Sequence, residues 1–449
     1  MEFSTMALNE LLCEKGHACA CGRVHKTGLR KVFLGAGVLN SLADALQEAG
    51  VSHPFVVSDA NTDVVAGDKV RGLLQEAKIP YHSFVFPPVS GMLEPDERSV
   101  GALCMAFDPA CDGILAIGSG VLNDCCKTLA HAAHVPSIVV GTAPSMDGYA
   151  SDNASMIQNH SKVSLYNASP VVIIADTDIL VAAPEDMLKA GLGDMLAKYI
   201  SICEWRISHL ITDEFYCENI AQLVRSSLAK IRQNAEALLQ REPAAIEHVV
   251  EGLILSGVAM SFAEISRPAS GLEHYFSHLW EMDALQQGKT PSLHGIQVGV
   301  GTCLTLKCYD KLRGYTPDEK AATEKVQHFS AEEWERGICA DFREDTAREL
   351  LDLEKKAQKN SPQMHAVRLQ KLLAHWDQIQ QIMADELPTS DSIIALMQKL
   401  GMAVTPQNIG LTREDAVSAL MHSRDIREKY LTSSMLWDLG ELENFAELL

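Results

Sequence analysis

Residues 113–127, GILAIGSGVLNDCCK, decide the fold of this chain. The run GILAIG is apolar throughout, as expected of a strand that is buried on both faces of a parallel sheet. It leads into glycines at 118 and 120 and then into a helix-like segment, where backbone N–H groups can bind a phosphate. The spacing differs from the G-x-G-x-x-G fingerprint, and glycines after a strand also form plain turns. The stretch therefore predicts a strand–helix unit whose turn is a candidate dinucleotide cradle.

Further apolar runs extend this pattern in both directions along the chain. They are KVFLG at 31–35, FVVS at 55–58, YHSFVF at 81–86 and SIVVG at 137–141. Segments of helix length separate them, and repeated strand–helix units predict a parallel sheet with helices on both faces. After VVIIAD at 171–176 the periodicity becomes helical. We therefore expect a leader at 1–29, an α/β domain at 30–178 and an all-α domain at 179–449.

Composition and charge exclude several classes of protein. The chain has 449 residues, of which 47% are hydrophobic and 22% charged, as is typical of folded globular proteins. Its 38 basic and 59 acidic residues give a net charge of −21, which repels nucleic acid and anionic membranes. No segment has the roughly 18 uninterrupted apolar residues of a membrane span. Twelve cysteines are too few for a disulfide scaffold of this length. We expect no nucleic-acid partner, no membrane insertion, and a cytoplasmic protein with reduced thiols.

The leader contains a group of metal-binding residue types. The segment HACACGRVHK at 17–26 includes His17, Cys19, Cys21 and His25, and Cys13 lies shortly before it. Such a group could bind zinc. Its spacing contains no C-x-x-C pair, which favours a mobile or packed leader with ordinary thiols.

Polar residues that follow two of the predicted strands are candidates for binding a dinucleotide. Asp59 ends the run FVVS, where an acid can accept hydrogen bonds from an adenosine ribose; it could equally cap a helix. The segment GTAPSMDGYASDNAS at 141–155 offers Thr142 and Ser145 as donors and Asp147 as a partner for a substrate hydroxyl. A segment of this composition also forms ordinary turns. Its place beside the glycine turn, at the end of a strand, favours ligand binding.

An acid and three histidines suggest a metal site farther along the chain. Asp194 lies in AGLGDMLAKYIS, His274 and His278 in SRPASGLEHYFSHLWEM, and His294 in LHGIQVGVG. The first two histidines are four residues apart and share one helical face. Considered one at a time, Asp194 could lie near the start of a helix and interact favourably with the helix dipole, and the histidines could be buried core residues. Together they indicate a divalent cation with an open coordination position, and zinc, nickel and iron all suit these ligands.

These segments resemble the sn-glycerol-1-phosphate dehydrogenase family, within the superfamily of iron-containing alcohol dehydrogenases, glycerol dehydrogenases and dehydroquinate synthases. The matching blocks are TAPSMDGYAS, GLGDMLAKY, SRPASGLEHYFSH and HGIQVGVGT, in family order. The resemblance implies a Rossmann-like α/β domain followed by an all-α domain, with the active site in the cleft between them. It implies a homodimer or larger homo-oligomer that interconverts dihydroxyacetone phosphate and sn-glycerol 1-phosphate, using NAD or NADP and one divalent metal ion.

The resemblance also implies roles for individual residues. Asp59 contacts the ribose, and the other dinucleotide contacts are Gly118, Ser119, Gly120, Val121, Leu122, Thr142, Ala143, Pro144, Ser145 and Ser151. The metal ligands are Asp194, His274 and His294, and the catalytic and substrate-binding residues are Asp147, Asp194 and His278. Leu272 stands where a smaller or polar residue is expected in relatives. Independently of the resemblance, a phosphorylated substrate needs cationic or N–H donors, for which Lys198 and Arg267 are candidates, although each could equally make a structural ion pair. A dehydrogenase for an unphosphorylated polyol, or a lyase of the dehydroquinate synthase type, remains an alternative.

Overall fold

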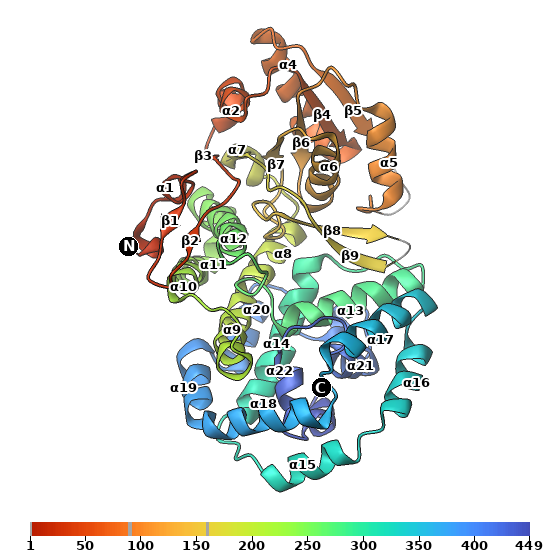
Figure 1. The fold of residues 1–449 in the computed structure, drawn as a ribbon. Helices are drawn as coiled ribbons and strands as arrows, with labels where there is room; N and C mark the ends of the chain where they lie inside the picture. Colours follow the sequence, from red (N-terminus) through yellow and green to blue (C-terminus); the bar gives the residue numbers. More distant parts are fainter. Residues whose placement is uncertain (1, 89–91, 159–160) are drawn as a thin grey trace. The chain divides into compact units, whose positions relative to one another are not determined.

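The computed structural model describes residues 2–88, 92–158 and 161–449 (Figure 1). Packing divides the chain into two compact units that alternate along the sequence. Unit 1 comprises Met1–Lys198, Cys217–Ala269 and Leu293–Ile296, and unit 2 comprises Tyr199–Tyr216, Ser270–Ser292 and Gln297–Leu449. The domain boundary predicted after residue 178 is a single point in the sequence, whereas each packed unit consists of three separate segments. The predicted boundary stays a prediction.

A parallel six-stranded sheet forms the centre of unit 1 (Figure 1). Its strands, in spatial order, are β3 (Lys31–Gly35), β10 (Val172–Asp176), β7 (Ser137–Gly141), β6 (Gly113–Gly118), β4 (Pro54–Asp59) and β5 (His82–Phe86). Every residue of β6, β7 and β10 is buried, which explains why their sequences are apolar without alternation. Gly118 lies opposite Gly141, so β6 and β7 end side by side. The predicted parallel α/β sheet is confirmed.

Helices pack on both faces of this sheet. α2 (Leu42–Ala49) and α4 (Asp68–Glu76) pack on the face that carries Val56, Ile117 and Val140. The intervening residues of each strand point to the other face. α6 (Gly120–Ala133) contacts β4, β6 and β7, and α5 (Glu97–Ala106) packs on α6. The remaining short elements here are η2 (Val38–Ser41), α3 (Ala60–Thr62) and the π-helical turn η3 (Asp63–Gly67).

Unit 1 also contains an antiparallel hairpin that the sequence pattern did not indicate. It consists of β8 (Asn153–Gln158) and β9 (Ser161–Tyr166), and β8 packs against α6. Four of the six β8 residues are only partly buried or exposed, so its sequence lacks the continuous apolar run of the central strands. The hairpin follows the segment with the predicted binding residues.

The N-terminal segment packs against the helices of unit 1. It contains η1 (Phe3–Thr5), α1 (Leu8–Leu11), and a small antiparallel hairpin of β1 (His17–Ala18) and β2 (Val24–His25). Phe3 and Leu11 are buried; η1 contacts α10 (Glu218–Gln233), and β2 contacts α12 (Pro243–Ala263). The leader is therefore packed rather than extended away from the fold.

The helices of unit 1 after the sheet surround one apolar helix. The apolar helix is α12, and the helices around it are α7 (Thr177–Leu180), α8 (Glu185–Leu196), α10 and α11 (Ala235–Leu239). By length and composition alone α12 could cross a membrane, but 83% of its most apolar window is buried inside the structure. It contacts α7, α8, α10 and α11, as the core helix of a globular unit does.

In the part of unit 2 that the structure describes, every regular element is helical, as predicted for the C-terminal part of the chain. The longest are α9 (Lys198–Thr212), α13 (Leu272–Gln286) and α14 (His294–Leu312). The others are α15 (Glu319–Gln327), α16 (Ala331–Asp341), α17 (Glu344–Ala357), α18 (Pro362–Ala374), α19 (Trp376–Glu386), α20 (Ser390–Lys399), η4 (Pro406–Ile409), α21 (Arg413–His422), α22 (Thr432–Asp438) and α23 (Leu442–Ala446). The first residue of α9 and the first three of α14 belong to unit 1.

Candidate active site

The glycine turn after β6 presents unpaired backbone donors. Ser119 is the N-cap residue of α6, and among the described residues no side chain caps this helix. The N–H groups of Gly120, Val121 and Leu122 precede the first intrahelical bond, in which Asn123 N donates to Ser119 O at 3.0 Å. Ser119, Gly120 and Val121 are only partly buried. The geometry suits a phosphate at this helix N-terminus.

Steric crowding explains why position 118 is a glycine. A Cβ added there would lie 2.5 Å from Cδ1 of Leu122, so any side chain would displace the first turn of α6. Thr142 N donates to Gly118 O at 3.2 Å, which joins the turn after β6 to the segment after β7. The two predicted dinucleotide-contacting segments are thus adjacent at the ends of neighbouring strands.

The segment after β7 packs closely against two helices. A Cβ on Gly191 of α8 would lie 1.9 Å from the carbonyl oxygen of Pro144, and one on Gly257 of α12 would lie 2.9 Å from the Ser151 nitrogen. The Tyr149 hydroxyl donates to Ala143 O from within the same segment. The predicted contacts Thr142, Ala143, Pro144, Ser145 and Ser151 are all buried. These approaches hold the segment rigidly.

A buried lysine that is not among the residues predicted from sequence also orders this segment. Lys127 Nζ donates to Gly148 O at 3.1 Å and to Ser151 O at 3.4 Å, and it pairs with Asp124 Oδ1 at 3.1 Å. The Ser151 hydroxyl donates to the carbonyl oxygens of Gly148 and Asn153 at 3.1 and 3.0 Å. Ser151 therefore already holds the backbone in shape. The sequence does contain a signal for Lys127, because it is a charged residue in the largely apolar helix that follows the glycine turn.

Asp59 caps a short helix. Its Oδ1 accepts from Asn61 N at 2.9 Å and Thr62 N at 2.8 Å, at the start of α3. This is the capping role that the sequence left open beside the ribose contact. Both bonds use one carboxylate oxygen, so the predicted ribose contact stays a prediction.

Two buried carboxylates share one buried ammonium group. Lys198 Nζ lies 2.6 Å from Asp147 Oδ2 and 3.2 Å from Asp194 Oδ1, and it donates to Ala269 O at 3.0 Å. Asp147 N donates to Asp194 Oδ2 at 2.8 Å, and the Ser256 hydroxyl donates to Asp147 Oδ2 at 2.7 Å. Burial disfavours the ammonium form, but the two carboxylates outweigh burial and raise the pKa of Lys198. The structure thus brings the predicted Asp147 and Asp194 together.

His294 lies beside Asp194 within unit 1. An imidazole nitrogen of His294 and a carboxylate oxygen of Asp194 lie within 4.8 Å of each other. The approach depends on Gly295, where an added Cβ would lie 2.0 Å from the carbonyl oxygen of Ala190 in α8. A carboxylate and an imidazole at this separation suit one divalent cation.

His274 lies in unit 2 with a carboxylate behind it. The residue is 4% exposed, and its Nδ1 lies 2.9 Å from Oε1 of Glu273. The same oxygen accepts from Gly271 N at 2.7 Å, which holds the carboxylate in place. A carboxylate on one ring nitrogen orients the other for a metal. Glu273 is not among the residues predicted from sequence, although an acid beside a candidate ligand was visible.

Three more predicted residues have defined places. The ring centroid of His278, one turn after His274, lies 6.3 Å from that of His274, as the four-residue spacing predicts. Leu272 begins α13 and is fully buried, so its side chain belongs to the core of unit 2. Arg267 is 1% exposed in unit 1. Its position does not test whether Arg267 contacts a phosphate, so that role stays a prediction.

Comparisons with known proteins identify the family of this chain. Residues 33–184 match a family model described as iron-containing alcohol dehydrogenase. A curated relative from Halalkalibacterium halodurans, "Glycerol-1-phosphate dehydrogenase [NAD(P)+]", is 30% identical over 425 residues, covering 94% of this chain and 95% of that protein. A protein of the same name from Methanosarcina acetivorans is 34% identical over 278 residues, covering 62% of this chain and 76% of that protein.

Solved structures show a similar fold at lower sequence identity. The crystal structure of glycerol dehydrogenase from Schizosaccharomyces pombe matches with a TM-score of 0.61 at 16% identity, covering 94% of this chain and 90% of that chain. A probable glycerol dehydrogenase from Sinorhizobium meliloti matches with a TM-score of 0.58 at 15% identity, covering 94% and 98%. At this identity the likeness concerns the fold alone.

Proposed function

This chain belongs to the glycerol-1-phosphate dehydrogenase family of iron-containing alcohol dehydrogenases, and from that premise we propose that it interconverts dihydroxyacetone phosphate and sn-glycerol 1-phosphate with NAD or NADP. The observation that carries the proposal beyond family membership is the position of His294 beside Asp194. Their ligand atoms lie within 4.8 Å, next to the ion pairs of Lys198. A carboxylate and an imidazole at this separation suit a divalent cation, which can polarise the oxygen of a hydroxyl or carbonyl substrate.

The dinucleotide is proposed to bind at the carboxyl ends of β6 and β7. The backbone of residues 118–122 receives the pyrophosphate, because the first N–H groups of α6 lack intrahelical acceptors. The buried segment at 142–145, with Ser151, forms the wall beside it, and Asp59 contacts the ribose. When bound, the nicotinamide supplies or accepts the hydride, while the protein aligns it with the substrate.

Asp194, His274 and His294 are proposed to hold one divalent ion, either zinc, nickel or iron. The donor set fits, since Asp194 and His294 are neighbours in unit 1 and Glu273 orients the ring of His274 in unit 2. When bound, the ion supplies polarisation of the substrate oxygen at the carbon that is oxidised or reduced. Three protein ligands leave a position for that oxygen.

The surrounding side chains are proposed to bind the substrate and manage its proton. Asp147 accepts a hydrogen bond from a substrate hydroxyl, and Lys198 pairs with both Asp147 and Asp194 and holds them in place. His278 exchanges the proton of the reacting hydroxyl through an imidazole nitrogen. Because Lys198 already pairs with two carboxylates, we assign the substrate phosphate to Arg267.

Activity on matched substrates tests the proposal. Purified protein loaded with zinc, nickel or iron in turn is given NADH or NADPH and either dihydroxyacetone phosphate or dihydroxyacetone. We expect oxidation of the nucleotide with the phosphorylated ketone and a product of sn-1 configuration. Equal turnover with dihydroxyacetone would support the polyol alternative and overturn the phosphate assignment. A lyase of the dehydroquinate synthase type would leave the nucleotide without net oxidation; it would also be expected to carry glutamate at position 194.

Variants on one helix test the metal assignment. Asp194→Ala should lose the divalent ion and the activity, whereas Asp186→Ala, an exposed change at the start of α8, should retain both. Metal content and nucleotide oxidation are measured on the same samples. A fully active Asp194→Ala variant would contradict the site.

The oligomeric state and the cellular location of the protein are also proposals. We propose a homodimer or larger homo-oligomer, to be checked by light scattering coupled to size-exclusion chromatography. All twelve cysteines lie in the described residues and none of them forms a disulfide, which supports a reducing, cytoplasmic location.

A further inference from the structure

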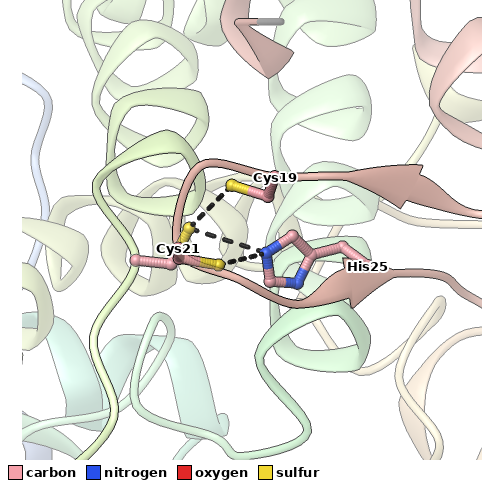
Figure 2. A group of neighbouring side chains, drawn as sticks. Cys19, Cys21 and His25 are labelled. Carbon is pink, nitrogen blue, oxygen red and sulfur yellow. Dashed lines mark hydrogen bonds between the residues drawn. The ribbon is translucent and has the colours of Figure 1, made fainter.

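Four side chains outside the candidate active site converge near the N-terminus, and we call them the thiol cluster. Cys19 and Cys21 lie in the turn between β1 and β2, and His25 is the last residue of β2. Cys217, 192 residues after His25, directly precedes α10. One ligand atom from each lies within 4.8 Å of all the others. Figure 2 shows Cys19, Cys21 and His25 directed toward one another from the hairpin.

Three of the six separations between the ligand atoms can be compared with those of a tetrahedral zinc site. Sγ of Cys217 lies 3.6 Å from Sγ of Cys19 and 3.6 Å from Nε2 of His25, and Sγ of Cys21 lies 3.1 Å from that nitrogen. With Zn–S of about 2.3 Å and Zn–N of about 2.0–2.1 Å, a regular tetrahedron has S···S of about 3.8 Å and S···N of about 3.6 Å. Two of the three separations need almost no change, and the third lengthens by about half an ångström to reach that geometry.

The hairpin backbone places the two leader thiols. Cys19 N donates to Arg23 O at 3.0 Å and Gly22 N donates to Cys19 O at 3.1 Å, which closes a tight turn. Gly22 has a φ of +87°, a conformation that glycine adopts without strain. This turn, rather than a C-x-x-C spacing, brings Cys21 and His25 to the same side.

Neighbouring groups orient the ligand atoms. His25 Nδ1 lies 2.7 Å from the carbonyl oxygen of Phe262, so this nitrogen carries the proton and donates. Nε2 then presents its lone pair to the thiols, as in histidines that bind metals. Asn219 Nδ2 donates to Sγ of Cys19 at 3.2 Å, which favours a thiolate. Both partners lie in the helices of unit 1, far from the hairpin in sequence.

We propose that Cys19, Cys21, His25 and Cys217 bind one structural zinc ion. Three thiolates and one imidazole complete its coordination, so no position is left for a substrate. The site shares no residue with the candidate active site, and it does not depend on the proposed function. The ion ties the N-terminal segment to the start of α10.

The local architecture gives the ion a structural task. β1 and β2 are only two residues long, and an isolated hairpin of that size is not stable in water. Phe3 and Phe262 pack against His25, at ring-centroid distances of 5.6 and 5.8 Å. Zinc adds folding free energy in such small elements because a preformed site does not exist in the unfolded chain.

Metal analysis of the intact protein tests the proposal. The protein is purified without chelator and its active site is loaded with nickel, so that zinc reports only the thiol cluster. We expect one zinc per chain, and zinc-edge X-ray absorption with three sulfur neighbours at about 2.3 Å and one nitrogen at about 2.0–2.1 Å. Absence of sulfur neighbours, or a protein without zinc whose thiols are free or disulfide-bonded, would overturn the proposal.

Matched serine variants give the second measurement. Cys19→Ser and Cys217→Ser should lose the zinc while retaining the nickel, and trypsin should cleave their N-terminal segment faster. Cys13→Ser changes an exposed thiol in the same leader and should retain both metals. If the variants fail to fold, the absorption spectrum of the unaltered protein still decides. Unchanged zinc content in a folded Cys217→Ser variant contradicts the site.

Discussion

The ammonium nitrogen of Lys198 lies 2.6 Å from Oδ2 of Asp147, in the interior of unit 1. The Lys198 side chain is fully buried and that of Asp147 is 12% exposed, so each charge depends largely on the other for compensation. Asp194 joins the same group through Lys198 Nζ and the backbone nitrogen of Asp147. The arrangement holds two carboxylates close together at the candidate metal site.

Lys198→Met should destabilise the protein strongly. It leaves Asp147 and Asp194 buried without their cation, and removing one partner of a buried pair costs about 3–5 kcal/mol in the free energy of unfolding. Urea unfolding measures the loss. The control is Lys189→Met on α8, whose partner Glu185 is exposed, and it should change stability little. Equal stability of the two variants would show that the buried pairs are not needed for folding.

Gly295→Ala should weaken metal binding more than it weakens the fold. The added methyl group would lie 2.0 Å from Ala190 O, so His294 must move away from Asp194. We expect at least a tenfold loss of divalent-metal affinity, measured by competition with a chelator. Gly337→Ala is the matched control, because nothing lies within 4 Å of its added Cβ in α16. Identical metal affinities would argue against the closeness of α8 and His294.

Glu273→Gln should lower metal affinity through His274. The glutamine keeps an acceptor for Gly271 N but loses the negative charge that holds the proton on Nδ1. Loss of such an orienting carboxylate lowers metal affinity by about 10–100-fold. Asp283→Asn on the same helix, where Gln287 donates to the carboxylate, is the control. Tight metal binding by the glutamine variant would mean that Glu273 does not orient the ligand.

Asp63 should contribute stability that disappears in acid. Arg71 donates to its two oxygens at 2.6 and 3.0 Å, and these bonds lower the pKa of Asp63 from its ordinary value of 3.8. A lowered pKa means that the contribution is complete above about pH 4 and is lost as the pH falls through the folded-state pKa. In urea unfolding, the stability difference between the unaltered protein and Asp63→Asn should therefore shrink below pH 4. A difference that is constant from pH 7 to pH 3 would contradict this assignment.

Much of the fold could be predicted from local sequence. The central strands are apolar runs because both of their faces are buried, and Gly118 and Gly120 mark the turn into α6. The hairpin of β8 and β9 was missed because only two of the six residues of β8 are buried, so that it lacks such a run. Asp194 and His294 were first identified as candidate ligands by residue type, and the family resemblance then assigned them to one metal site. Glu273 and Lys127 act through contacts with backbone and neighbouring side chains, which spacing alone does not reveal.

By itself the sequence determined the parallel α/β sheet, the helical remainder and the family, since strand burial, helical periodicity and motif order are all local properties of the chain. Only the tertiary structure showed that Lys198 joins Asp147 to Asp194, and that Cys217 completes the thiol cluster begun by Cys19, Cys21 and His25. In the leader, spacing favoured ordinary thiols, because the fourth side chain lies 192 residues away from His25. Ligand sets and buried ion pairs are made by segments that only folding brings within a few ångströms.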